Sequence, residues 1–119
     1  MIIGTKTRLV EPDITVVELS GHLNLGNNLS QLEYMVKKLI EGGVRKLAFD
    51  VANLNYIDSA GIGMLVGTNG QMDGAGGQIR IAGAQGTVAK VFDTVHMDKI
   101  VAVDADVAAS LEMLSAERV

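Results

Sequence analysis

The sequence predicts an α/β fold: a mostly parallel sheet of four to five strands, an antiparallel N-terminal strand and about four helices, packed mainly on one side of the sheet. Strand-like and helix-like segments alternate along most of the chain, and strands separated by helices pair in parallel through right-handed crossovers. The chain has 119 residues, 48% of them apolar. This length and composition indicate that residues 1–119 form a single domain around one core.

A hairpin is predicted at the N-terminus. Residues 5–10 alternate weakly between apolar and polar, and residues 14–19 are rich in β-branched side chains, which favour strands. Residues 11–13, with Pro12 between Glu and Asp, are typical of a turn. Two strands joined by so short a link pair antiparallel. Residues 21–26, which include two glycines, then break the strand pattern.

The middle of the chain predicts a helix, a strand and a second helix. Asn28 and Gln31 stand at the spacing of a capping box, and apolar residues follow at three- and four-residue steps until two glycines end the pattern. We expect a strand over residues 44–51. After a polar link, a second helix should begin near Ser59 and end near residues 74–77.

The last third predicts two more strands and two more helices. Residues 78–83 alternate cleanly and indicate a strand. A helix over residues 88–95 follows, with Thr87 as its cap. We expect a short strand over residues 100–103 and a final helix capped by Asp104.

Composition and charge narrow the range of functions. The net charge is −4, the pI is near 5, and the chain has two Tyr, two Phe and no Trp. Direct binding of nucleic acid is therefore not expected. No Cys is present, which excludes disulfides and thiolate metal sites. Without a signal-peptide pattern or an apolar run of about 18 residues, we expect a cytoplasmic protein with no membrane insertion.

The Asp58–Ser59 pair lies where a strand-like segment meets a helix-like one. Ser59 should therefore lie at a helix N-terminus, beside free backbone N–H donors and the positive end of the helix dipole. A hydroxyl in this place can be shown to a partner, and the helix would stabilise a phosphate on it. The alternative is structural, because Asp and Ser are both ordinary N-cap residues.

Four glycines at 4-3-4 spacing follow in the same predicted helix, and they would form one stripe along it. They are Gly63, Gly67, Gly70 and Gly74. An interior glycine costs a helix about 0.5–1 kcal/mol relative to alanine, so the stripe calls for a reason. Either it packs closely against the domain's own sheet, or it forms a shallow groove for a partner protein.

Signals for catalysis are weak. The two histidines, His22 and His96, lack zinc-binding spacing, and no G-x-S-x-G elbow surrounds Ser59. The glycine pairs do not complete a dinucleotide motif, and no Walker-type phosphate loop is present. Three aspartates near element ends are expected to be caps or solvated surface: Asp93, Asp98 and Asp104. We expect no catalytic residue, no metal and no cofactor, and hence not an enzyme.

Three segments carry a resemblance to a known family. They are residues 19–24 (LSGHLN), residues 56–65 (YIDSAGIGML) and residues 76–83 (GGQIRIAG), the last leading into residues 88–95. In this order they closely resemble the STAS family, and within it the stand-alone bacterial anti-sigma factor antagonists. The resemblance extends from about Thr5 to Leu114 and implies the same α/β fold.

The resemblance also implies a phosphorylation switch. In phospho-switch members, the Ser of the D-S-x-G motif, here Ser59, is phosphorylated by a serine kinase that is also the anti-sigma factor. The unphosphorylated antagonist binds this kinase and frees the sigma factor, and a serine phosphatase resets the switch. The family's common second Ser is Ala60 here, which leaves Ser59 as the acceptor. Its usual Asp after G-x-L is Asn24, in a loop expected near the start of the Ser59 helix.

The partner surface implied by the resemblance surrounds the motif and extends toward residues 87–95. Its expected residues are Asn24, Asp58, Ser59, Ala60, Gly61, Gly63, Met64 and Gly67. An alternative within the same family is a scaffold or transporter-accessory subunit that binds a partner through this surface and is never phosphorylated. Asn24 favours this alternative, since it removes a carboxylate from the loop.

Overall fold

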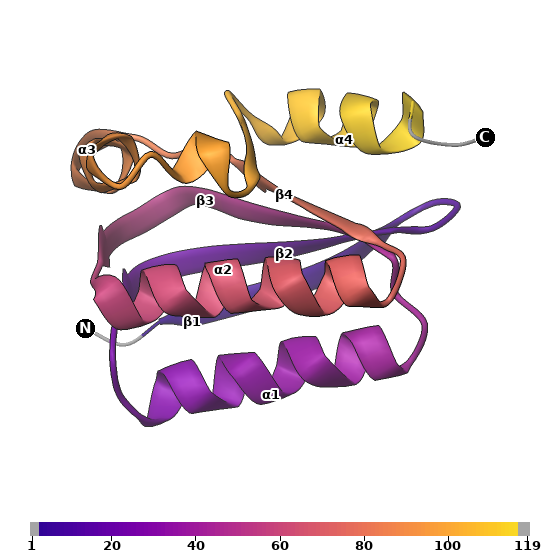
Figure 1. Cartoon of the computed structure of the whole chain (residues 1–119), viewed down its shortest axis with the longest axis horizontal. Helices are drawn as coiled ribbons and strands as arrows, with labels where there is room; N and C mark the ends of the chain where they lie inside the picture. The colour runs from indigo at the N-terminus through magenta and orange to yellow at the C-terminus, as the bar shows by residue number, and fades with distance from the viewer. Residues whose placement is uncertain (1–2, 117–119) are drawn as a thin grey trace.

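The computed structural model describes residues 3–116, which form a five-stranded sheet between layers of helices (Figure 1). The elements are β1 (Gly4–Val10), β2 (Ile14–Leu23), α1 (Asn27–Glu41), β3 (Lys46–Ile57), α2 (Ser59–Gly74), β4 (Gln78–Ala82), α3 (Gly86–Thr94), the 3-10 turn η1 (Met97–Lys99), β5 (Ala102–Asp104) and α4 (Val107–Ala116). The predicted α/β fold class is confirmed. Of the predicted span 1–119, residues 1–2 and 117–119 lie outside the described residues.

The strands follow one another in the sheet in chain order, β1-β2-β3-β4-β5. β1 pairs antiparallel with β2, with Thr7 opposite Val17, and the other three pairings are parallel. The predicted N-terminal hairpin is therefore confirmed, as is the parallel remainder of the sheet. Helices supply the crossovers between β2 and β3 and between β3 and β4, as parallel pairing requires.

Alternate residues along the strands divide the sheet into two faces. Val17, Phe49 and Ile81 lie in one row across the three central strands, and all three are fully buried in the core shared with α1, α2 and α3. The neighbouring Val16 and Ala48 point to the opposite face, where they pack with α4. Figure 1 shows α1 and α2 side by side on one side of the sheet and α4 on the other.

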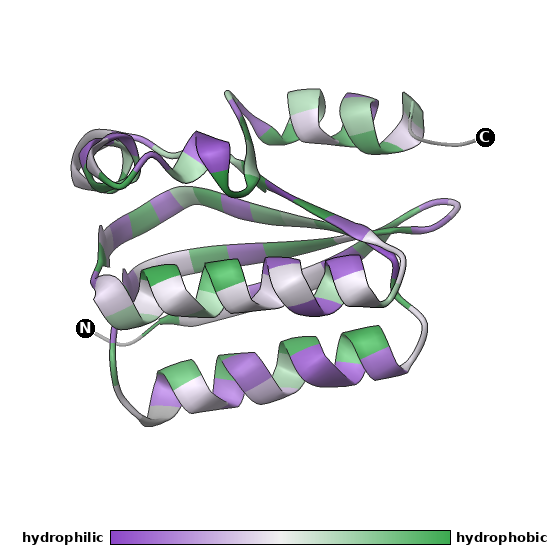
Figure 2. Ribbon diagram, in the orientation of Figure 1, coloured by the Kyte–Doolittle hydropathy of each residue, from purple (hydrophilic) through white to green (hydrophobic). Residues whose placement is uncertain are grey.

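The first helix buries one side only. Leu29, Leu32 and Val36 recur at helical spacing and are buried, while the residues between them are largely exposed. Figure 2 shows the apolar residues of α1 gathered on the side that faces α2 and the sheet. Tertiary burial of this stripe, rather than helix propensity, is what stabilises the element.

Two strands run farther than the sequence predicts. β2 continues through Gly21 to Leu23, and β3 continues through Asn53 to Ile57. The two extensions pair with each other, with shifts of register after Glu18 and after Gly21. Ladder hydrogen bonds therefore override the low strand propensity of glycine and asparagine.

Two predicted helix caps are wrong. α1 starts after Gly26, whose φ of 152° favours glycine. Because glycine has no side chain, this N-cap makes no side-chain hydrogen bond. Asn28 lies inside the first turn of the helix. α3 starts after Gln85, which has an extended backbone, and Thr87 lies inside that helix. In both cases the N-cap lies two residues before the polar residue on which the prediction rested.

Asp104 is neither the cap of α4 nor part of the solvated surface, which corrects that prediction as well. Asp106 caps α4, because its Oδ1 accepts a hydrogen bond from the Ala109 N–H at 2.9 Å. Asp104 instead accepts two hydrogen bonds from Arg80, from Nε at 2.7 Å and from Nη2 at 3.0 Å, and one from the Ser110 hydroxyl at 2.6 Å. This cluster ties together β4, β5 and α4.

The cluster is largely shielded from water and depends on charge. The Arg80 and Asp104 side chains are each 11% exposed, and Ser110 is fully buried. The hydrogen bonds from Arg80 hold the pKa of the Asp104 carboxyl below its ordinary value of 3.8, against the opposing effect of burial. The carboxylate is therefore ionised at neutral pH, and the pair is held by charge-assisted hydrogen bonds.

We expect Asp104→Asn to lower the free energy of unfolding by about 2–3 kcal/mol at neutral pH, because it removes the carboxylate charge that faces Arg80. Since the folded-state pKa is lowered, the carboxylate's contribution is complete above the unfolded pKa and is lost as the pH falls through the folded one. Urea unfolding over this acidic range should therefore show a flatter pH dependence for the variant. Asp98→Asn is the control, because it removes an exposed carboxylate and should change stability little. An equal loss of stability in Asp104→Asn and Asp98→Asn would contradict the assignment.

Candidate functional site

Ser59 is the first residue of α2, and its side chain is exposed. It follows the ends of β2 and β3, which are paired through Leu23 and Ile57. Both of these residues are buried, so the strands are fixed in the core directly up to the turn. The hydroxyl is therefore presented on a rigid base, at the positive end of a 16-residue helix.

The Asp58 carboxylate holds this turn in place. Its Oδ1 accepts a hydrogen bond from the Gly61 N–H at 2.9 Å, which caps α2, and its Oδ2 accepts one from the Leu25 N–H at 3.1 Å. The Asp58 N–H donates to the Leu23 carbonyl at 3.2 Å. One residue thus joins the start of α2 to the loop between β2 and α1, which confirms that this loop lies near the Ser59 helix start.

These contacts also separate the roles of the two motif residues. Asp58 is the cap, so the structural alternative holds for that residue. The Ser59 hydroxyl makes no hydrogen bond to any residue between 3 and 116, so it does not cap the helix. Partial desolvation raises the pKa of Asp58, but the N–H donors of Gly61 and Leu25 outweigh it and hold that pKa below its ordinary value. The site therefore carries a negative charge at neutral pH beside a neutral hydroxyl.

Gly61 is required by the closeness of α2 to β2. A Cβ on this residue would lie against the Leu23 carbonyl oxygen, 2.8 Å from Ile57 Cγ1 and 3.0 Å from Leu23 Cγ. Backbone oxygen does not move aside as a side chain does. The first turn of α2 can approach the end of β2 this closely only because residue 61 has no side chain.

The glycine stripe farther along α2 has the opposite character. Gly63, Gly67, Gly70 and Gly74 are all exposed, and a Cβ on any of them would meet no atom of residues 3–116 within 4 Å. Close packing of the stripe against the sheet is therefore wrong. Between α1 and α2 lies instead a shallow hollow of about 80 Å³, lined by Glu33, Gly63, Met64, Gly67, Thr68 and Gln71.

The predicted partner-binding residues fall into two groups. Exposed or partly exposed at the surface are Asn24, Asp58, Ser59, Ala60, Gly63 and Gly67. Gly61 and Met64 are buried, Met64 to 3% exposure, so they support this surface from beneath, and Met64 contributes to it only as part of the lining of the hollow. Residues 87–95 belong mostly to α3, which packs against β3 and buries Val88 and Phe92 in the core.

Leu25 is a candidate contact that the sequence analysis missed. Its side chain is 79% exposed although its N–H is bound to Asp58, so a large apolar group stands in solvent on a backbone anchored to the residue before Ser59. The signal was present in the sequence as a leucine between Asn24 and Gly26, in a loop where no helical or strand pattern calls for it. Tyr56, 42% exposed, stacks at a tilt on His22 with ring centroids 5.4 Å apart, at the same ends of β2 and β3.

The described residues offer neither a metal site nor a membrane-spanning helix. Between residues 3 and 116, no three His, Cys, Asp or Glu side chains come together in a way that could hold a metal ion. No helix in this part of the chain is both long enough and apolar enough to cross a bilayer.

The two kinds of glycine in α2 should respond oppositely to the same change. We expect Gly61→Ala to lower the free energy of unfolding by about 1–3 kcal/mol, because the new methyl overlaps the Leu23 carbonyl. Gly67→Ala should raise it by about 0.5–1 kcal/mol, because the methyl meets open space and the helix gains propensity. Urea unfolding of both variants measures this, and destabilisation by Gly67→Ala would show that the stripe is packed after all.

Several solved structures share this fold. An anti-sigma factor antagonist from Mycobacterium paratuberculosis is 17% identical, with a TM-score of 0.81 over 95% of this chain and 94% of the other. The anti-sigma factor antagonist SpoIIAA matches in its unphosphorylated form (17% identity, TM-score 0.73, 98% and 100% of the two chains) and, as a Bacillus cell fate determinant, in its phosphorylated form (19%, 0.72, 92% and 98%). A sulfate transporter family protein from Wolinella succinogenes is 10% identical, with a TM-score of 0.72 over 92% and 90%.

At these identities the structures establish a common fold. The sequence itself matches the family model of the STAS domain over residues 6–110, which is most of the chain and includes the Asp58–Ser59 turn. The three segments that suggested this family all lie within the matched range. On the strength of both the sequence match and the fold, the chain belongs to the STAS domain family.

Proposed function

We propose that this chain is an anti-sigma factor antagonist that acts in the cytoplasm by binding a serine kinase that is also an anti-sigma factor. While Ser59 is unphosphorylated the chain binds this kinase, and the sigma factor is released. Phosphorylation of Ser59 ends the binding, and a serine phosphatase restores it. The observation that carries the proposal is the exposed Ser59 hydroxyl at the first position of α2, which does not cap the helix because Asp58 does.

The surface around Ser59 is suited to a protein partner. Leu25 offers an exposed apolar anchor in the loop that is bound to Asp58, and large apolar side chains that become buried carry much of the affinity of an interface. Along α2, Gly63 and Gly67 leave the helix backbone open, so a partner can approach closely. Because these glycines cost helix stability without improving the packing of the domain, a role at an interface accounts for them.

Phosphorylation would act here through charge. A phosphate adds about −1.5 to −2 charges, and at a helix N-terminus this should leave the domain folded. It would stand next to the Asp58 carboxylate, whose lowered pKa keeps it ionised at neutral pH. A partner would then have to desolvate a dianion beside a second negative charge, which weakens binding without a large change of conformation.

Ser59→Asp should keep the fold and the melting temperature but bind the cognate kinase at least about tenfold more weakly, a difference of about 1.4 kcal/mol. Ser59→Ala should bind like the parent chain and resist phosphorylation. Titration calorimetry with the cognate kinase measures both affinities. Equal affinity for Ser59→Asp and the parent would reject the switch, while loss of binding in Ser59→Ala would mean that the hydroxyl is itself a contact.

Leu25→Ala should lower the affinity for the same kinase about tenfold, because it truncates the apolar anchor. Its folding free energy should stay within about 0.5 kcal/mol of the parent, since the side chain is exposed and the hydrogen bond to Asp58 uses the backbone. Leu9→Ala is a matched control, because Leu9 is another exposed leucine, 59% accessible, on β1. If the two variants bind alike, Leu25 is not an anchor.

A second candidate is a STAS scaffold or transporter-accessory subunit that binds a partner through the same surface and is never phosphorylated. The fold likeness to a sulfate transporter family protein and the neutral Asn24 favour it. Intact mass after incubation with ATP and candidate kinases separates the two, with Ser59→Ala as the blank. A gain of one phosphate in the parent alone supports the switch. Stable binding with no gain of mass supports the scaffold.

A further inference from the structure

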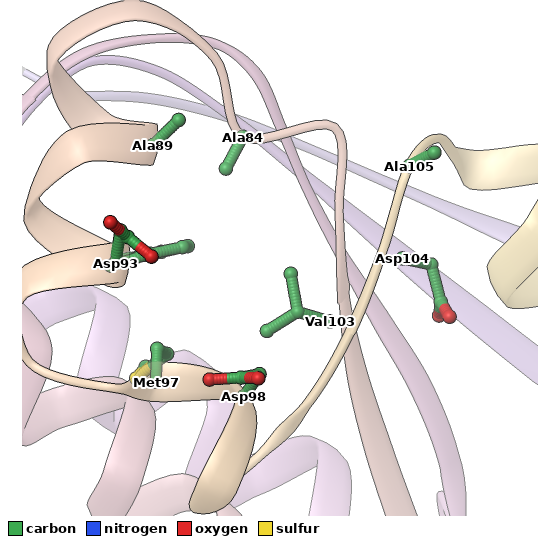
Figure 3. Close-up of a pocket in the computed structure, with 9 residues that line it drawn as sticks. Ala84, Ala89, Asp93, Met97, Asp98, Val103, Asp104 and Ala105 are labelled. Atoms are coloured by element: carbon green, nitrogen blue, oxygen red, sulfur yellow. The ribbon is translucent and has the colours of Figure 1, made fainter.

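A larger hollow lies between α3, η1 and the segments that follow β4 and β5 (Figure 3). Its volume is about 360 Å³, which is within the usual range for small-ligand pockets. Polar and apolar atoms share its lining about equally, and the apolar part comes from Ala84, Ala89, Phe92, Met97, Val103 and Ala105. Phe92 and Met97 belong to the core, so this lining rests on packed residues.

Two carboxylates stand at the edge of this hollow, beside its apolar residues. Figure 3 shows Asp93 from α3 and Asp98 from η1 on the rim of the hollow, whereas Asp104 is turned away from it, consistent with its bonds to Arg80. Within residues 3–116, neither the Asp93 nor the Asp98 carboxylate takes part in an ion pair or a side-chain hydrogen bond. Two negative charges therefore face one hollow without a cation from the described chain.

The lining decides which kind of cation fits. Divalent hard cations take six or more oxygen ligands, and the described residues bring no third carboxylate or imidazole to this place. An organic cation on an apolar stem uses both features, because its stem contacts the carbon lining while its charge meets the carboxylates. Guanidinium suits two separate carboxylates better than ammonium, since it is planar, weakly hydrated and has five N–H donors.

We propose that this hollow is a binding site for an alkylguanidinium group about the size of an arginine side chain. The Asp93 and Asp98 carboxylates accept hydrogen bonds from the guanidinium, and the alkyl stem lies against Ala84, Ala89 and Val103. The site is separate from Ser59 and does not depend on the proposed switch.

The test uses the full chain with isotope-labelled alanine and valine methyls and n-butylguanidinium as the probe. Nuclear magnetic resonance titration should give saturable shifts at Ala84, Ala89 and Val103, with a Kd of about 1 mM, as expected for so small a ligand. Binding should weaken as salt is added. n-Butylurea, which has nearly the same shape without the charge, should bind at least about tenfold more weakly.

Asp93→Asn and Asp98→Asn should each weaken binding of the probe about threefold, and the double variant about tenfold, as expected for partly exposed ion pairs. Glu112→Gln is the matched control, because it removes the same charge from an exposed position on α4 and should leave the Kd unchanged. Unchanged methyl shifts elsewhere in each variant verify the fold.

The source of the group is tested with acetyl-Gly-Arg-Gly-amide. Shifts at the same methyls would support an arginine of a protein partner, and binding of n-butylguanidinium alone would support a free small cation. The proposal is overturned if the probe gives no saturable shift at about tenfold its expected Kd. It is equally overturned if n-butylurea binds as well, or if the double variant binds the probe as the parent does.

Discussion

The close approach of the first turn of α2 to the end of β2 is the constraint on which the site depends. Every helix start leaves backbone N–H groups without partners, and at the start of α2 the Asp58 carboxylate accepts a hydrogen bond from one of them, the Gly61 N–H. The same carboxylate also accepts a hydrogen bond from the Leu25 N–H, in the loop between β2 and α1. The contact is possible because residue 61 has no Cβ to meet the Leu23 carbonyl. With Asp58 committed to these bonds, the next residue, Ser59, is left with its hydroxyl in solvent.

Both faces of the sheet serve stability, and both candidate sites lie at one edge of it. The large core beneath α1, α2 and α3 fixes the strands, and the Arg80–Asp104–Ser110 cluster fixes α4 on the opposite face. Both candidate sites lie where parallel strands end: Ser59 after β3, and the Asp93–Asp98 hollow next to the segments that follow β4 and β5. Parallel sheets commonly present their ligand sites at this edge, because the chain leaves the core there in loops that are free to vary.

The composition of α2 indicates a balance between stability and interaction. An exposed helix face built from alanine would be more stable than one with four glycines, and no described residue packs on these glycines closely enough to require their small size. Gly61 differs, since packing alone accounts for it. In one helix, therefore, one glycine allows close packing, and the exposed glycines leave the helix surface without side chains. Residue type alone cannot distinguish these two roles.

Patterns that are local in the chain were sufficient to predict much of this protein. Periodicity indicated the element order, the hairpin, the apolar stripe of α1 and the helix start at Ser59, because each depends on residues a few positions apart. The extensions of β2 and β3 through Gly21 and Asn53 were not predictable in this way, since they depend on pairing between distant segments. The same is true of Asp104, whose partner Arg80 is 24 positions away, and of the Leu25 bond to Asp58, which spans 33. Only the tertiary structure decides whether a cap, a glycine or a leucine faces packed atoms or water. This is because the segments that surround each of these residues come from distant parts of the chain.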